Sequence, residues 1–128
     1  MTELQILLLT YVLSGLLMIA IAEPLIRRKI KPNPWYGFRL RATLEDPVIW
    51  YEVNAAGGRG LRRAGAGITL SALILYLIPG LSTDAYALLC TAVMVVLMTV
   101  CLVAAFRSLS ALTKRRKAGD LPKDDMPR

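Results

Sequence analysis

The sequence has no histidine and only two cysteines, Cys90 and Cys101, among its 128 residues. The lack of histidine removes the commonest general base, the Ser-His catalytic pair and most zinc sites. The two cysteines stand in one apolar run, where a helix would separate them by about 16 Å, whereas disulfide-bonded Cα atoms lie within about 7 Å. We therefore interpret both cysteines as apolar filling residues that form no disulfide.

Charged residues are missing from three long stretches, residues 4–22, 64–83 and 85–106, which are rich in Leu, Ile, Val and Ala. A helix of about 20 apolar residues crosses the hydrocarbon core of a bilayer, and a helix pairs its own backbone polar groups there. The first stretch has no basic residue before it, which disfavours a cleaved signal peptide. The sequence predicts an all-α membrane protein whose single domain has three transmembrane helices.

Basic residues are missing from residues 1–22 and from the turn at 79–84. The central loop, 23–63, and the tail, 107–128, hold all 16 Lys and Arg residues. Because basic flanks stay in the cytoplasm, we expect a multi-pass protein of the cytoplasmic (inner) cell membrane with its N-terminus outside and its C-terminus cytoplasmic. The basic residues beside the spans are expected to contact lipid headgroups of the bilayer. They are Arg27, Arg28, Lys29, Lys114, Arg115, Arg116 and Lys117.

The second and third stretches predict a tight helical hairpin. Pro79 and Gly80 are expected to end the second span, and Asp84 can cap the third because a carboxylate accepts hydrogen bonds from free helix N–H groups. Gly67 and Ser71 form one pair of small residues four positions apart, a spacing that allows close helix approach. This last signal is weak, since such pairs are frequent in spans rich in small residues.

The central loop is rich in aromatic residues, unlike an ordinary linker. Its first half, 32–41, is expected to be extended, and Gly37 is expected at a positive φ or in close packing. Asp46 and Pro47 predict the start of a short interfacial cytoplasmic helix, which runs to about residue 56 and stops or bends at the glycines 57–58. Trp50 and Asn54 are one helical turn apart and so share a face.

Two interpretations of this loop remain open on the residues alone. In one, its aromatic side chains form a belt in the lipid headgroup region, while Arg39 and Arg41 bind phosphates. In the other, the loop folds into a cap against the cytoplasmic helix ends, and Arg39 and Asn54 offer polar contacts to a ligand or partner.

The loop resembles the signature of the SdpI/YfhL family of small bacterial membrane proteins. The shared pattern is a Pro-Asn pair, a Gly, an Arg, a Thr-Leu pair, a Trp, an Asn four residues later and a Gly. The matching residues are Pro32, Asn33, Gly37, Arg39, Thr43, Leu44, Trp50, Asn54 and Gly58. The resemblance covers about residues 30–60. It departs at Leu40, where many relatives carry Thr, and the founding member has more spans.

The resemblance implies a binding role rather than catalysis. The founding member protects a bacterium from its own secreted peptide toxin and also signals by drawing a repressor to the membrane. We accordingly expect a toxin-immunity or signalling protein that acts through the loop, with a peptide toxin or a cytoplasmic regulator as partner. The resemblance points to partner- or ligand-binding residues at Asn33, Gly37, Arg39, Thr43, Trp50 and Asn54.

An accessory or structural subunit of a larger membrane complex is the alternative function, with another membrane subunit as partner. An enzyme or transporter is disfavoured, because no acidic or basic residue lies inside a predicted span. The acidic candidates Glu23, Glu45, Asp46 and Glu52 all lie in the loop. We expect no catalytic residue, metal or cofactor. Nucleic acid is not an expected partner despite the net charge of +7, since membrane topology accounts for the basic residues.

Overall fold

Helices make up the fold of residues 1–122, the part of the chain that the computed structural model describes. They are α1 (Glu3–Ile26), α2 (Arg41–Leu44), α3 (Pro47–Tyr76) and α4 (Thr83–Lys117), and no strand occurs among these residues. The predicted all-α class is confirmed. The final six positions of the predicted tail, 123–128, lie outside the described residues.

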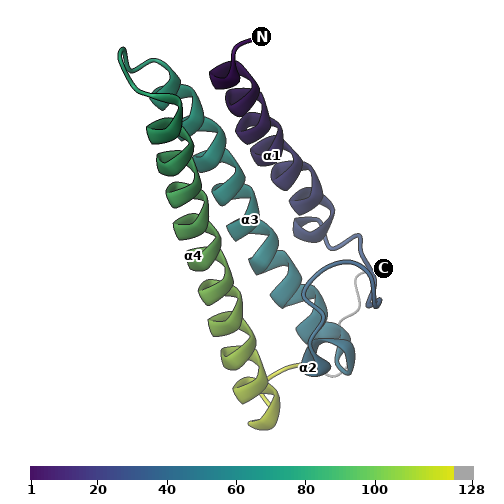
Figure 1. The fold of residues 1–128 in the computed structure, drawn as a ribbon. Helices are drawn as coiled ribbons and strands as arrows, with labels where there is room; N and C mark the ends of the chain where they lie inside the picture. The colour runs from purple at the N-terminus through teal and green to yellow at the C-terminus, as the bar shows by residue number, and fades with distance from the viewer. Residues whose placement is uncertain (123–128) are drawn as a thin grey trace.

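The three long helices lie side by side, with α3 between α1 and α4 (Figure 1). The N-terminus and the turn between α3 and α4 lie at one end of this bundle. The loop 27–46, with α2, and the C-terminal end of α4 lie at the opposite end. Therefore α1 and α4 run in the same direction, and α3 runs back between them.

Two helices within residues 1–122, α1 and α4, are long and apolar enough to cross a membrane. Few of their apolar side chains are buried and many are exposed, among them Leu13 and Leu17 of α1 and Leu88 and Val96 of α4. A core helix of a soluble protein would bury such residues, whereas a helix in lipid exposes them. The third predicted span, 64–83, does not meet the same criterion, so the count of three spans is not confirmed.

The expected short helix over residues 47–56 is not a separate element. Helix α3 runs without a break from Pro47 to Tyr76, straight through the glycines at 57–58. The expectation was wrong because these glycines lie against other helices and do not end their own. A Cβ placed on Gly58 would lie 3.1 Å from the carbonyl oxygen of Ala22, so the absent side chain lets α1 approach.

Helices α1 and α3 approach each other closely at Gly15 and Gly65. A Cβ placed on either glycine would lie 2.5 Å from the carbonyl oxygen of the other, which is too close for any side chain. The predicted small residue at Gly67 faces α4 instead, where a Cβ would lie 2.8 Å from Leu97 Cδ1. Small residues thus set the spacing on both sides of α3.

The turn between α3 and α4 begins earlier than expected. Helix α3 ends at Tyr76, before the proline and glycine that were expected to stop it, and Gly80 has a φ of +79°. The N-cap of α4 is Ser82, whose hydroxyl accepts a hydrogen bond from Ala85 N at 3.3 Å. Asp84 lies in the first helical turn instead, so its predicted role as the cap was wrong.

A small core closes the bundle at this end. Tyr86 of α4 is fully buried, and its hydroxyl donates to the carbonyl oxygen of Ala72 in α3 at 3.1 Å. Tyr11 of α1 packs edge-on against Tyr86, and its hydroxyl donates to Ala87 O at 3.1 Å. These bonds connect all three long helices at the end away from the loop.

Candidate functional site

The loop 27–46 opens with a turn built by Asn33. Its side-chain oxygen accepts hydrogen bonds from the backbone N–H groups of Trp35 at 2.9 Å and Tyr36 at 2.7 Å. Its amide nitrogen donates to Lys31 O at 2.7 Å. Asparagine commonly bonds its neighbours' backbone in this way in turns. Asn33 therefore shapes the loop.

Gly37 and Asn54 join the loop to α3. The Asn54 side chain is buried; its oxygen accepts from Phe38 N at 2.5 Å, and its nitrogen donates to Trp50 O at 2.9 Å. Gly37 has a φ of +104°, and a Cβ there would lie 2.5 Å from the Asn54 side-chain oxygen. The predicted positive φ at Gly37 is confirmed, and the close approach of Asn54 independently leaves no space for a side chain there.

Trp50 and Thr43 hold the two ends of the same loop. Trp50 is fully buried, and its indole N–H donates to Ile30 O at 2.8 Å. Thr43 is also fully buried; its hydroxyl accepts from Leu40 N at 2.9 Å and lies 2.7 Å from Phe38 O. Both side chains thus satisfy backbone groups that the loop would otherwise bury without partners.

Two aromatic residues of the loop attach it to the outer helices. The Tyr36 hydroxyl donates to Ile21 O in α1, and burial raises the pKa of Tyr36, which keeps this donor protonated. The ring of Phe38 packs edge-on against Phe106 of α4, with centroids 5.6 Å apart. The loop therefore forms a cap that touches α1, α3 and α4, which is the geometry of the second interpretation above.

A pocket of about 310 Å³ lies beneath this cap. Ile21 and Leu25 of α1 form one wall, Met98 and Leu102 of α4 form another, and Gly57 lies at its floor on α3. Arg39 is the one charged residue that lines it within residues 1–122. This arginine is exposed, and one of its terminal nitrogens donates to Pro34 O at 2.6 Å.

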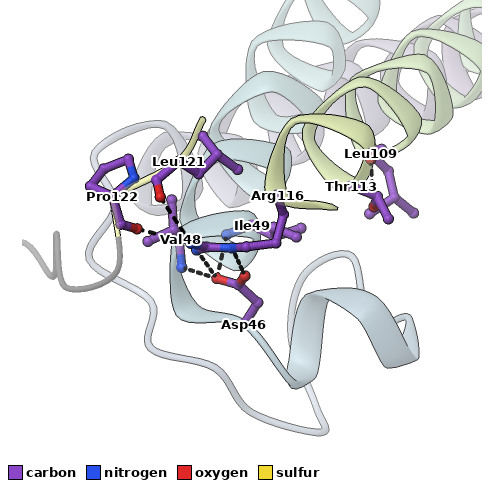
Figure 2. A network of polar contacts seen from close by, with 8 residues as sticks. All are labelled: Asp46, Val48, Ile49, Leu109, Thr113, Arg116, Leu121 and Pro122. Carbon is purple, nitrogen blue, oxygen red and sulfur yellow. Dashed lines mark hydrogen bonds and ion pairs between the residues drawn. The ribbon is translucent and has the colours of Figure 1, made fainter. Parts of the chain in front are cut away.

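An ion pair closes the far side of the loop, between Asp46 and Arg116 (Figure 2). Arg116 Nη2 donates to Asp46 Oδ1 at 2.8 Å, and its Nε donates to Oδ2. Asp46 also caps α3, accepting from Val48 N at 3.0 Å and Ile49 N at 3.3 Å, so the predicted cap is confirmed. Burial raises the pKa of Asp46, but the bonds from Arg116 and from the helix N–H groups outweigh burial and lower it.

Three of the seven basic residues expected at lipid headgroups form ion pairs with acidic side chains. Arg27 pairs with Glu23 at 2.8 Å, Arg28 pairs with Glu52, and Arg116 pairs with Asp46. The side chains of Lys29, Lys114, Arg115 and Lys117 are exposed. Within residues 1–122, no group of three His, Cys, Asp or Glu side chains lies close enough together to hold a metal ion.

Sequence reasoning missed the long-range contacts of this region. Asp46 was identified as a cap, but its ion pair with Arg116, 70 positions away, gave no local signal. The same holds for the packing of Phe38 on Phe106. Of the six residues expected to bind a partner or ligand, five bond or pack within the loop and α3, and Arg39 presents an exposed charged group.

The family model described as the SdpI/YfhL protein family matches residues 29–110. This match spans the loop, α2, α3 and most of α4. The chain belongs to the SdpI/YfhL family. Searches of curated proteins and of solved structures each returned no significant match.

Membership of the SdpI/YfhL family confirms the predicted resemblance and indicates an immunity-like membrane protein. The matched range contains the motif residues that build the cap, Asn33, Gly37, Thr43, Trp50 and Asn54. It leaves out all of α1, which ends at Ile26, so the family pattern is carried by the loop and the α3–α4 hairpin.

Proposed function

We propose that this protein crosses the cytoplasmic membrane three times and is a non-enzymatic binding protein in toxin immunity or signalling. The observation that carries this proposal is the cap: five residues of the family motif hold the loop over the bundle and leave Arg39 exposed at its edge. The partner is a peptide toxin or a cytoplasmic regulator that contacts this edge.

The course of the chain supports three spans. Because α1 and α4 run in the same direction, the chain between them must return to the starting side of the membrane. Helix α3 is the segment that returns. Its low hydropathy comes from Arg59, Arg62 and Arg63, which lie before its apolar half, and long arginine side chains can carry their charge to the headgroup region.

The distribution of charge supports the orientation. Within residues 1–122, Lys and Arg residues gather in the loop, the first half of α3 and the end of α4, while the end with the N-terminus and the α3–α4 turn has none. By the positive-inside rule, the cap then faces the cytoplasm of a bacterial cell. A cytoplasmic regulator could reach Arg39 directly, and a membrane-active peptide could reach it from the inner leaflet.

A non-enzymatic role is supported by the acidic side chains. Each acidic residue of the loop region pairs with an arginine, so none offers a free general base. The pairs are Glu23 with Arg27, Glu45 with Arg41, Asp46 with Arg116, and Glu52 with Arg28.

Survival of toxin-sensitive bacteria tests the proposal. Cells that express the protein are challenged with a panel of membrane-active peptide toxins, and we expect increased survival against at least one. Arg39→Ala should abolish protection, whereas Lys31→Ala, which removes an equally exposed charge from the same loop, should preserve it. Trp50→Ala is not used, because removing this fully buried side chain would unfold the loop.

A pull-down from native membranes supplies a second readout. The tagged protein is purified in mild detergent, and bound proteins and peptides are identified by mass spectrometry. A peptide or regulator that is retained by the wild type and lost from Arg39→Ala supports the proposal. A membrane subunit that stays bound to both forms, together with no gain in survival, would instead favour a structural subunit.

A further inference from the structure

We propose that the pocket beneath the cap binds an anionic phospholipid from the cytoplasmic leaflet. One acyl chain lies between α1 and α4, and the phosphate pairs with Arg39. This inference rests on the membrane orientation proposed above, but not on immunity or signalling.

The walls of the pocket suit an acyl chain. Its volume of about 310 Å³ is at the lower end of the range of small-molecule sites, about 300–1,000 Å³. Leu25, Leu61 and Met98 contribute apolar side chains, and Gly57 leaves the floor open. Asn54, a polar residue of the lining, already hydrogen-bonds Phe38 N and Trp50 O, so its side chain does not need a water molecule in the pocket as a partner.

The pocket is continuous with the surface that lipid covers. Ile21 and Leu102, on its opposite walls, are 38% and 48% exposed. They belong to the same outward-facing apolar surface as the other exposed apolar residues of α1 and α4. An acyl chain can therefore enter sideways from the bilayer without crossing water. A soluble ligand would have to displace these lipid contacts first, and this favours the lipid itself as the occupant.

The charge at the rim selects the headgroup. Arg39 is the one charged residue lining the pocket within the described chain, and a guanidinium has five N–H donors, of which one bonds Pro34 O. The fork of an arginine matches the geometry of phosphate, the anionic group that a phospholipid headgroup supplies. Trp35, 85% exposed beside it, is of the residue type that anchors at the headgroup level.

Photocrosslinking tests the site. The purified protein is reconstituted in vesicles that contain phosphatidylglycerol with a photoreactive group on its acyl chain, diluted in phosphatidylcholine. Peptide mass spectrometry then locates the labelled residues. We expect labelling concentrated at Leu61, Met98 and Leu102, above the level at lipid-facing positions away from the pocket such as Val96.

Filling the pocket should remove this excess labelling. A Cβ on Gly57 would meet Ala105 Cβ at 3.8 Å and Phe38 Cδ2 at 3.9 Å, which are ordinary contacts, so Gly57→Ala folds and Gly57→Leu extends into the space. Labelling at Met98 should fall in part in Gly57→Ala and to the level at Val96 in Gly57→Leu. Ala66→Leu, at an exposed position of the same helix, should leave it unchanged.

Removing the charge should change headgroup selection. Arg39→Gln should lower the preference for phosphatidylglycerol over an equally labelled phosphatidylcholine by about fivefold, the ratio that corresponds to one basic residue at a membrane surface. Lys31→Gln should leave the preference unchanged. Labelling that is uniform around α1 and α4 and unaffected by Gly57→Leu would overturn the proposal. Because this experiment needs no toxin or regulator, its failure would leave the survival assay to decide the proposed function independently.

Discussion

Asp46 and Arg116 form a two-point ion pair that fastens the C-terminal end of α4 to the N-terminal end of α3. The same carboxylate caps α3, and the same guanidinium donates to Leu121 O at 3.3 Å and Pro122 O at 3.0 Å (Figure 2). The side chains are 18% and 27% exposed, so solvent screens the pair only in part. One contact therefore organises a helix start, a helix end and the chain beyond it.

Breaking this pair should destabilise the basic end of the bundle. Arg116→Gln should lower the thermal unfolding midpoint in detergent by a few degrees, whereas Lys114→Gln, at an exposed position nearby, should leave it unchanged. Asp46→Asn retains a side-chain cap but loses the charge, so its effect and that of Arg116→Gln should not add in the double variant. Additive effects would show that the two side chains do not interact.

The contribution of the pair should depend on pH. The pKa of Asp46 is lower in the folded protein than its ordinary value of 3.8, so the folded state holds the charged carboxylate more strongly. The stabilisation is complete above the unfolded pKa and is lost as pH falls through the folded pKa. The difference in midpoint between wild type and Arg116→Gln should therefore be constant from pH 5 to 7 and shrink below about pH 4.

Gly37 and Gly80 offer a matched comparison of backbone strain and packing. Both have positive φ values, +104° and +79°, but a Cβ would meet Asn54 at Gly37 and nothing within 4 Å at Gly80. Gly80→Ala should cost about 1–2 kcal/mol of stability from strain alone. Gly37→Ala should cost about 1–3 kcal/mol more, since the Cβ also displaces the Asn54 side chain.

Limited proteolysis locates the effect of the Gly37 change. Trypsin cleaves after arginine, and Arg39 and Arg41 lie in or beside the segment that Gly37 and Asn54 hold. Cleavage there should accelerate in Gly37→Ala and remain at the wild-type rate in Gly80→Ala. Equal rates in the two variants would contradict the role assigned to the contact between Gly37 and Asn54.

The contact between Gly15 and Gly65 should be intolerant of any side chain. Gly65→Ala places a Cβ 2.5 Å from Gly15 O, so α1 and α3 must separate, at a cost of about 1–3 kcal/mol. Helix propensity acts in the opposite direction, since alanine is the better helix former by about 1 kcal/mol. Thermal unfolding in detergent should show a net loss for Gly65→Ala and none for Ala66→Leu, which faces outward on the same helix.

Cysteine labelling from outside the cell tests the orientation. In a background in which Cys90 and Cys101 are replaced by alanine, a cysteine at Ser82 should react with a membrane-impermeant reagent in intact cells. A cysteine at Glu45 should react only after the cells are opened, because the loop lies on the other side. Labelling of both sites in intact cells would exclude three spans with the N-terminus outside.

Local chemistry made several features of the loop predictable. Asp46 before Pro47 indicates a helix start, Gly37 indicates a positive φ, and the spacing of Trp50 and Asn54 places them on one face. Each depends only on residues within one turn of one another. The family signature was likewise readable, because its residues lie within one segment of the chain.

Predictions failed where a residue's role depends on another element. Glycines 57–58 were expected to break a helix, but α3 continues through them. Gly58 packs against α1, and Gly57 faces Ala105 of α4 and Phe38 of the loop, so their small size serves packing between elements. Asp84 was expected to cap α4, yet Ser82 does so because the preceding turn places its hydroxyl at the helix start. Propensity describes a residue by itself and gives no information about its neighbours in space.

By itself, the sequence determined the helical class, the apolar character of α1 and α4, the collection of basic residues into loop and tail, and the family. These follow from composition and from short-range spacing. Only the tertiary structure decided that Asp46 meets Arg116, that the motif folds into a cap, and that a pocket with one arginine lies beneath it. Such features arise where helices distant in sequence come together, and their geometry is set by the packing of all three helices at once.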